Sequence, residues 1–317
     1  MYRGKKVSLV IPAYNEEKLI RPTLLSVPDI IDRVYVIDDC SKDNMVNVVK
    51  EIASKDKRIE LIQHEKNKGV GQGIITGYLK SNKDGYDVAV VIGGDNQMDL
   101  KDLPNFLESI TKGEVDYVKG NRFLYAGGRP MVMPFKRLVG NSILSLMVKI
   151  ASGYYSIFDT QEGYTAITKE AIDKVNWDKA WKGYGYPGDF LILFNAYGLR
   201  VKDVPRRAIY LSDERQSQIK ILSYIWKVGP LYVKKFFWRL GYKYIMRDFH
   251  PLVFFYMLSF VLLPIGILLG VRAIWFAIQG PAPTNETILS ALSIMIGFLS
   301  LLFAMFFDMQ NNQKLQP

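Results

Sequence analysis

The most informative stretch of the sequence is VVIGGDNQMD, Val90–Asp99. An apolar, β-branched run that is typical of a buried strand ends here in two glycines, followed by a carboxylate, an amide and a second carboxylate. Asp95 and Gln97 therefore stand on a turn that a ligand can approach closely. Either the turn is an ordinary solvated loop, or the oxygens of these two side chains hold a cation.

Short β-branched runs alternate with helical patterns in the part of the chain that leads to this turn. The expected strands are Val7–Pro12, Arg33–Asp38, Ile59–Gln63 and Asp87–Ile92, and the expected helices are Glu16–Val27, Asp43–Lys55 and Gly73–Ser81. This alternation predicts a Rossmann-like α/β domain with a parallel sheet. In such a sheet the ligand crevice lies at the carboxyl ends of the strands.

A polar motif follows each expected strand. The motifs are PAYNE (12–16), DDCSKD (38–43), NKGVG (67–71) and GGDNQ (93–97). Because the carboxyl ends of parallel strands meet at one edge of a sheet, we expect one site built from all four. The segment GVGQG (69–73) lacks the spacing of a dinucleotide fingerprint. It is either a turn whose N–H groups face a phosphate or the plain start of a helix.

The pair Asp95 and Gln97 offers hard oxygen ligands. Such a pair suits Mg²⁺ or Mn²⁺, which keep several waters and complete their coordination with substrate phosphates. Asp99 lies further round the turn, where we expect it to face solvent. The D-x-Q pattern is common, so this interpretation depends on its place at the end of a strand.

The composition favours an anionic partner. Lys and Arg outnumber Asp and Glu by 41 to 31, and the formal net charge of +10 suits phosphates, nucleic acid or a lipid surface. Cys40 is the single cysteine, so an intrachain disulfide is excluded, and with two histidines a Cys/His zinc site is not expected. The N-terminal apolar run is too short for a signal-peptide core, which predicts a cytosolic N-terminal domain.

Two uncharged runs of 21 residues, Pro251–Val271 and Thr287–Phe307, predict a membrane hairpin. Each run has about the ~20 residues that an α-helix needs to cross the hydrocarbon core. We expect spans at 251–278 and 287–307. The alternative is a pair of buried soluble helices, which seldom run so long without a charge.

The segment before the first span is strongly basic. Between Ile219 and His250 there are seven Lys and Arg residues against one acid, and the connector Gln279–Glu286 has no Lys or Arg. This bias predicts that both chain ends and the N-terminal domain lie in the cytoplasm. Aromatic residues alternate with the cations, which favours one or two interfacial helices on anionic headgroups over a nucleic-acid patch. The predicted organisation is a catalytic domain (1–218), juxtamembrane helices (219–250) and a two-span hairpin with a short tail (251–317).

Taken in order, the motifs resemble those of family 2 glycosyltransferases with the A-type fold. The motifs that carry the resemblance are PAYNE (12–16), VIDDCS (36–41), GDNQ (94–97), GNR (120–122), DTQEGY (159–164) and the pair Val204-Pro205. Together with the membrane hairpin they resemble the polyprenyl-phosphate (dolichyl-phosphate) glycosyltransferases within that family. The resemblance runs from residue 7 to about residue 220.

The resemblance implies inverting transfer of a hexose from a GDP-mannose or UDP-glucose type of donor to a polyprenyl phosphate. It implies Asp95 and Gln97 as ligands of Mg²⁺ or Mn²⁺. It implies a nucleotide-sugar pocket that also includes Pro12, Ala13, Tyr14, Glu16, Asp39, Gly71 and Gln161. It implies that Arg122, Arg137 and Ser217 meet the acceptor phosphate, and that Arg215, Ser217 and Lys220 close over the diphosphate.

Two positions depart from the family's pattern. The usual Asp-x-Asp is Gly93-Gly94-Asp95, so one carboxylate is absent and a lower metal affinity is expected. The usual Ser-Lys is Ser217-Gln218, which leaves Lys220 as the substitute cation. Whether Arg207 or Arg215 serves the diphosphate stays open.

The chemistry of the acceptor decides which other residues are needed. A lipid phosphate is already an anionic nucleophile, so it needs arginines to position it and no general base. A hydroxyl acceptor needs a base, for which Asp189 is the candidate. A membrane glycosyltransferase acting on a sugar hydroxyl and a non-catalytic nucleotide-sugar binder are the alternatives.

Several chosen residues have simpler interpretations. Asp38 is also suited to capping the following turn, and Glu16 to a helix N-terminus. Asp159 and Gln161 are also suited to a turn. We expect His64 and His250 on the surface.

Overall fold

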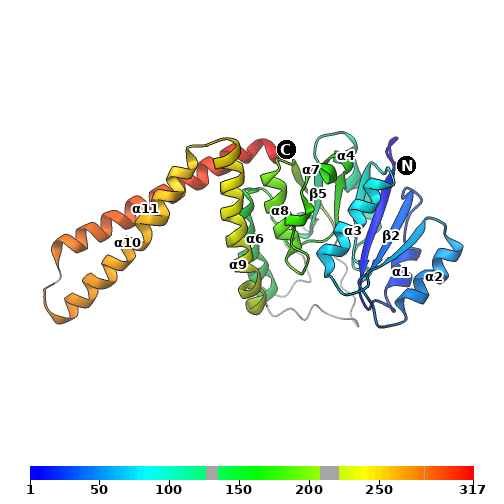
Figure 1. Ribbon diagram of the computed structural model, residues 1–317, viewed down its shortest axis with the longest axis horizontal. Coiled ribbons are helices and arrows are strands. Elements are labelled where there is room, and N and C mark those ends of the chain that lie inside the picture. The colour runs from blue at the N-terminus through cyan, green and yellow to red at the C-terminus, as the bar shows by residue number, and fades with distance from the viewer. Residues whose placement is uncertain (126–134, 208–220, 282) are drawn as a thin grey trace. The chain divides into compact units, whose positions relative to one another are not determined.

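The computed structural model describes residues 1–125, 135–207, 221–281 and 283–317 (Figure 1). They form two compact units, Met1–Phe236 with Lys314–Pro317, and Phe237–Gln313. The first unit extends past residue 218, where the sequence placed the end of the first domain. The reason is that the first part of helix α9 (Ile221–Arg239) buries Val228 and Tyr232.

A seven-stranded sheet forms the centre of the first unit, in the order β3-β2-β1-β4-β6-β5-β7. The strands are β1 (Val7–Ala13), β2 (Arg33–Asp38), β3 (Ile59–Gln63), β4 (Val88–Val91), β5 (Tyr117–Asn121), β6 (Thr165–Thr168) and β7 (Val201–Pro205). The four strands expected from the sequence are present, each end within one residue of its expected place. The sheet is mixed rather than parallel, because β6 runs antiparallel to both β4 and β5.

The reversed direction of β6 determines which residues reach the crevice. The other strands deliver the residues that follow them to the carboxyl edge of the sheet. Strand β6 instead delivers the residues that precede it, because Thr165, its first residue, pairs with Val91 near the end of β4. The segment Asp159–Tyr164 therefore arrives beside the turn after β4 and the residues that follow β5 and β7.

Helices cover both faces of the sheet (Figure 1). They are α1 (Ile20–Leu25), α2 (Met45–Lys55), α3 (Val70–Lys83), α4 (Leu103–Thr111), α5 (Arg122–Tyr125), α6 (Phe135–Ser152), α7 (Lys169–Lys174) and α8 (Tyr186–Ala196). Helices α1, α2 and α4 share a buried core with one face, in which Leu9, Val36 and Phe106 are fully buried. On the other face an aromatic cluster joins α3, β5 and α8, through the contacts Tyr78–Trp177, Trp177–Phe190 and Tyr117–Phe194.

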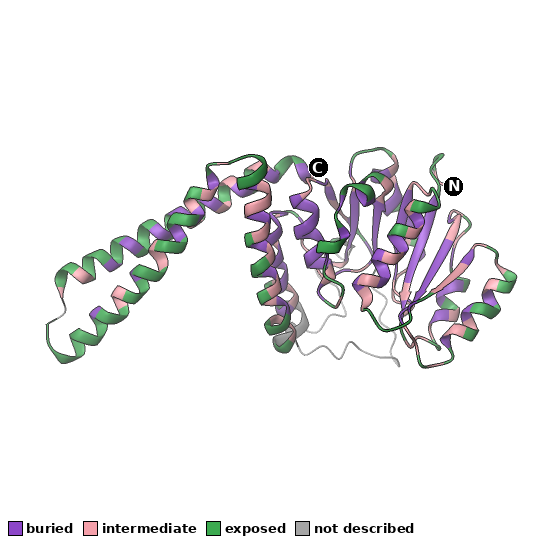
Figure 2. Ribbon diagram, viewed as in Figure 1, coloured by how far each residue is buried: buried purple, intermediate pink, exposed green. Residues whose placement is uncertain are grey.

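The second unit is a helical hairpin of α10 (Leu252–Gln279) and α11 (Thr284–Asn312), preceded by a π-helical segment, Leu240–Arg247. Both hairpin helices are long and apolar enough to span a membrane. Figure 2 shows that most of their surface is exposed, and the exposed side chains are largely Leu, Ile, Phe and Met. Small residues allow close packing: a Cβ on Gly297 would lie 3.0 Å from the backbone nitrogen of Leu263.

A buried ion pair ties the end of α9 to the end of α11. The Arg239 Nη2 atom lies 2.7 Å from Asp308 Oδ2, and both side chains are fully buried. Tyr244 donates to Asp308 Oδ1 at 2.6 Å, and the Asn312 amide donates to the same oxygen at 2.8 Å. The carboxylate is thus fully satisfied by groups of the second unit.

Removing this carboxylate is expected to destabilise the hairpin. Asp308→Ala leaves the Arg239 charge buried without its partner, which costs about 3–5 kcal/mol of unfolding free energy. The matched control is Arg272→Ala, which breaks a more exposed pair with Glu286 at 3.1 Å and should cost no more than about 1 kcal/mol. Reversible unfolding in detergent micelles measures both, and equal losses would contradict the prediction.

Candidate active site

A cleft of about 690 Å³ lies at the carboxyl edge of the sheet. Its lining combines residues that follow β1, β2, β4 and β5 with residues around the start of α8 and from α9. They include Pro12, Ala13, Tyr14, Glu16, Asp39, Gly69, Asp95, Arg122, Gln161, Tyr184, Tyr186 and Tyr224. Most of the described residues that the sequence assigned to the nucleotide sugar therefore share one cavity.

Asp39 organises the end of the cleft nearest to β2. Its carboxylate accepts hydrogen bonds from the backbone N–H groups of Lys68 (2.8 Å) and Gly69 (2.7 Å). Gly69 has φ +90° and precedes helix α3, and a Cβ there would lie 2.5 Å from the Lys182 carbonyl oxygen. The absence of a side chain at this position thus allows the backbones of Gly69 and Lys182 to lie close together. Gly71 also packs against the backbone of Lys182, and it does not line the cleft.

The prediction that His64 is a surface residue is wrong. Its side chain is buried, with Nδ1 2.8 Å from Asp39 Oδ1 and Nε2 3.0 Å from Thr76 Oγ1. The position directly after β3 brings the ring beneath Asp39, which the sequence pattern did not reveal. Asp38 accepts a hydrogen bond from the Ser41 backbone N–H at 2.9 Å, as its simpler interpretation predicted.

The turn after β4 presents Asp95 to the cleft. Burial raises the pKa of the Asp95 carboxyl, and the backbone N–H of Gln97, 3.3 Å from Oδ1, only partly offsets this effect. A bound cation would compensate such a carboxylate, so the donor chemistry fits a divalent metal. Within the described ranges no three His, Cys, Asp or Glu residues gather as a metal site, so substrate oxygens would have to complete the coordination.

The other two side chains of this turn have different surroundings. Gln97 is half-buried, and its side chain is not part of the cleft lining. Asp99 is also half-buried, and its carboxylate accepts a hydrogen bond from the Lys101 backbone N–H at 2.9 Å. It therefore caps the short 3₁₀ helix Leu100–Asp102.

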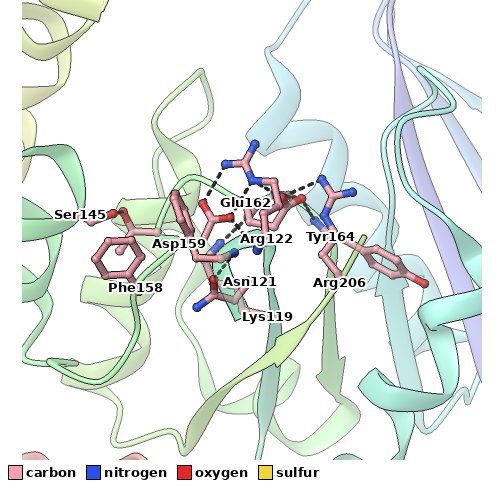
Figure 3. Close-up of polar contacts among 12 residues, drawn as sticks. Lys119, Asn121, Arg122, Ser145, Phe158, Asp159, Glu162, Tyr164 and Arg206 are labelled. Carbon is pink, nitrogen blue, oxygen red and sulfur yellow. Dashed lines mark hydrogen bonds and ion pairs between the residues drawn. The ribbon is translucent and has the colours of Figure 1, made fainter. Parts of the chain in front are cut away.

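Arg122 begins α5 directly after β5 and lines the cleft. Its Nε and Nη2 atoms donate to the two oxygens of Asp159 at 2.7 and 2.8 Å. The Nε atom also lies 3.1 Å from Glu162 Oε2. Figure 3 shows the guanidinium held against these two carboxylates. Asp159 is therefore a buried partner of Arg122, rather than a simple turn residue.

Sequence reasoning missed three charged residues behind the cleft: Lys119, Glu162 and Arg206. All three are buried. Burial lowers the pKa of Lys119 to about 8. Burial by itself would raise the pKa of Glu162, but Arg206, Arg122 and Lys119 together lower it to about 2. Glu162 stands within the motif DTQEGY, but nothing in the sequence marks it as the centre of a charge cluster.

Asp189 lies in the first turn of α8 and does not line the cleft. Its fully buried carboxylate accepts a hydrogen bond from the Trp181 backbone N–H at 2.7 Å and lies 3.0 Å from Lys235 Nζ on α9. Burial raises the pKa of the Asp189 carboxyl, and Lys235 opposes this.

On the cleft side of α9, Tyr224 donates to the side-chain oxygen of Gln161 at 3.1 Å.

The remaining site predictions fall outside the described part of the chain. Arg215, Ser217 and Lys220 lie in the range 208–220. Arg137 belongs to α6, but its side chain is not described.

Comparison with known proteins gives consistent matches. The family model described as glycosyl transferase family 2 matches residues 8–175. The chain is 32% identical over 219 residues to a UDP-N-acetylglucosamine–dolichyl-phosphate N-acetylglucosaminyltransferase of Methanococcus voltae, covering 65% of this chain and 86% of the relative. It is 28% identical over 203 residues to an undecaprenyl-phosphate mannosyltransferase of Micrococcus luteus, covering 63% and 82%.

A solved structure shares the fold. Glucosyl-3-phosphoglycerate synthase from Mycobacterium tuberculosis, in complex with Mn²⁺, UDP and glucosyl-3-phosphoglycerate, matches with a TM-score of 0.52 and 20% identity, covering 75% of this chain and 81% of that one. This likeness confirms the A-type fold expected from the sequence.

Proposed function

Because the chain belongs to glycosyltransferase family 2, we propose that this glycosyltransferase moves a sugar from a nucleotide diphosphate donor to a polyprenyl phosphate at the cytoplasmic membrane face. One observation carries the proposal. The strand-end residues Asp39 and Asp95, the arginine Arg122 and the helix α9 all contribute to one cleft. A donor and an anionic acceptor would therefore meet in the same cavity.

The residues of the cleft have separate roles in this reaction. Asp39 orients the nucleoside, and Asp95 would hold a Mg²⁺ or Mn²⁺ ion together with substrate oxygens, which would neutralise the charge of the leaving diphosphate. Gln97, the second ligand expected from the sequence, does not line the cleft. Arg122 positions the acceptor phosphate. A phosphate oxygen attacks the anomeric carbon as the bond to the diphosphate breaks, and the nucleoside diphosphate leaves. Attack from the face opposite the leaving group inverts the anomeric centre.

The surface of the first unit supports a lipid acceptor. Helix α6 exposes Val139, Ile143 and Leu146, and α9 exposes Trp226 and Val233. The two helices touch each other, since a Cβ on Gly229 would lie 3.5 Å from the Met147 methyl carbon. Exposed apolar side chains on neighbouring helices suit the isoprenoid chain and the membrane interface. The named activities of the relatives from Methanococcus voltae and Micrococcus luteus agree with this acceptor class.

The surroundings of Asp189 favour a phosphate over a hydroxyl acceptor. A general base has to reach the proton that it removes, whereas Asp189 is buried against Lys235 and does not line the cleft. A phosphate needs no such base.

A donor and acceptor screen tests the proposed function. Purified protein with Mn²⁺ is offered UDP-N-acetylglucosamine, UDP-glucose and GDP-mannose, each with dolichyl or undecaprenyl phosphate. We expect one donor to yield a base-stable, β-linked lipid phosphosugar. Transfer to a sugar hydroxyl, with none to either lipid phosphate, would contradict the proposal.

The expected topology has its own test. In a background in which Cys40 is replaced by serine, a cysteine introduced at Asn285 should react with an impermeant maleimide added outside intact cells. A cysteine at Gln313 should react only after permeabilisation. The expectation follows from the basic segment before the first span and the positive-inside rule. The reverse labelling pattern would place the cleft on the opposite side of the membrane.

A further inference from the structure

The Glu162 carboxylate is the centre of the buried charge cluster formed by Lys119, Glu162 and Arg206. Glu162 Oε1 accepts hydrogen bonds from the backbone N–H groups of Gly163 (3.0 Å) and Tyr164 (3.1 Å). The other oxygen, Oε2, lies 2.8 Å from Arg206 Nη2 and 3.1 Å from Arg122 Nε. Figure 3 shows both guanidinium groups directed toward this carboxylate. Two arginines from different strand ends therefore share one buried anion.

Arg206 also reaches the turn that carries Asp95. Its Nη1 atom donates to the carbonyl oxygen of Gln97 at 3.0 Å and to that of Arg207 at 2.9 Å. The planar guanidinium thus bridges Glu162 and the backbone of the turn with two different nitrogens. Arginine is suited to this geometry because its donors are fixed in a rigid fork.

The local fold makes room for this bridge. Gly120 in β5 lies beneath it, and a Cβ there would come within 3.0 Å of the Arg206 Cγ and 3.2 Å of the Glu162 Cγ. Lys119 adds a further contact, since its Nζ donates to the Glu162 backbone carbonyl at 2.6 Å. Glu162 is thereby fixed through its side chain and its backbone.

We propose that Glu162 and Arg206 are positioning residues that set the metal-binding turn and Arg122 relative to each other. Arg206 holds the Gln97 carbonyl, and Glu162 holds Arg206 and Arg122 on the same oxygen. The two residues do not contact the substrate in this role. The proposal rests on the proposed function for the identity of the acceptor, but the position of the turn is measurable without any lipid.

The first experiment uses no lipid acceptor. Binding of Mn²⁺ with UDP, and separately with GDP, is followed by electron paramagnetic resonance on the full chain in detergent. Arg206→Met should weaken binding of the metal–nucleotide pair by roughly 10- to 100-fold, as is typical when a group that orients a metal site is lost. Arg206→Lys should also weaken it, because a single nitrogen does not replace both Nη positions.

The matched control is Arg200→Met at the opposite end of β7. Arg200 pairs with Asp116 through two nitrogens, at 2.9 Å from Nη2 to Oδ1 and 3.3 Å from Nε to Oδ2, and is more exposed than Arg206. It lies away from the cleft, so binding should not change. Wild-type affinity in both Arg206 variants would overturn the proposal.

Amide hydrogen exchange gives a ligand-free measurement on the same proteins. Peptides covering residues 92–100 should exchange faster in both Arg206 variants than in wild type or Arg200→Met. Should Arg206→Met fail to fold, Arg206→Lys keeps the charge beside Glu162 and provides the same comparison. Unchanged exchange in this turn would overturn the proposal.

Glu162→Gln tests the shared oxygen. The variant keeps an acceptor for the N–H groups of Gly163 and Tyr164 but removes the charge that holds Arg206 and that lies 3.1 Å from Arg122, which Asp159 also binds. We expect weaker metal–nucleotide binding and also a KM for polyprenyl phosphate raised roughly tenfold. A change in metal–nucleotide binding alone, or in the KM for polyprenyl phosphate alone, would overturn the proposed link between the turn and Arg122. If wild type does not use lipid phosphate, the proposed function fails, while the binding and exchange results still decide the role of Arg206.

Discussion

Replacing Asp95 with alanine is expected to lower Mn²⁺-dependent transfer by roughly a hundred- to a thousand-fold. Asp95 is the carboxylate on the turn after β4 that lines the cleft. Without it, the cleft would offer the metal no carboxylate from this turn, and the charge of the leaving diphosphate would be less well neutralised. Initial rates measured over a range of Mn²⁺ concentrations give the loss in kcat and the shift in half-saturation separately.

Asp99→Ala is the matched control for this experiment. It removes a carboxylate from the same turn, but one that caps the 3₁₀ helix Leu100–Asp102. The loss of a cap costs about 1 kcal/mol of stability and should leave transfer within a few-fold of wild type. Near-normal turnover of Asp95→Ala, or equal losses in the two variants, would contradict the metal assignment.

Arg122→Ala is expected to weaken transfer to a lipid phosphate, whereas Asp189→Asn is expected to leave it largely unchanged. Arg122→Ala removes a charge-assisted contact to the acceptor, worth about 2 kcal/mol or more, which is about a 30-fold loss in kcat/KM for the lipid. Arg137→Ala is expected to act in the same direction. Donor hydrolysis, which does not use the lipid, should survive in both. Asp189→Asn should leave transfer and its pH profile largely unchanged, because a phosphate nucleophile needs no carboxylate base.

The structure adds one control to this comparison. Arg122 is also the partner of the buried Asp159, so Arg122→Ala is expected to lower stability as well, and thermal unfolding must be measured beside activity. Arg122→Lys retains a positive charge and is the milder variant. If Asp189→Asn abolishes transfer while neither arginine matters, the acceptor is a hydroxyl and the lipid-phosphate proposal is wrong.

Local patterns in the sequence were sufficient for much of the fold. The short β-branched runs placed β1 to β4 to within one residue at each end. The two uncharged runs predicted the hairpin helices α10 and α11. The strand-end motifs contain Asp39 and Asp95, and the family resemblance added Arg122; all three line one cleft. These features depend on neighbouring residues, and hydrophobic periodicity reports directly on such short-range order.

Tertiary structure alone decided which charged residues are buried together. The antiparallel direction of β6 brings Glu162 to the crevice edge, where it meets Arg206, a residue 44 positions away in the chain. Lys119 and His64 are polar residues, and the local sequence does not show whether they are exposed or buried. A buried charge is stable only when partners from distant segments satisfy it. Strand order and direction determine those partners, and no short stretch of sequence specifies them.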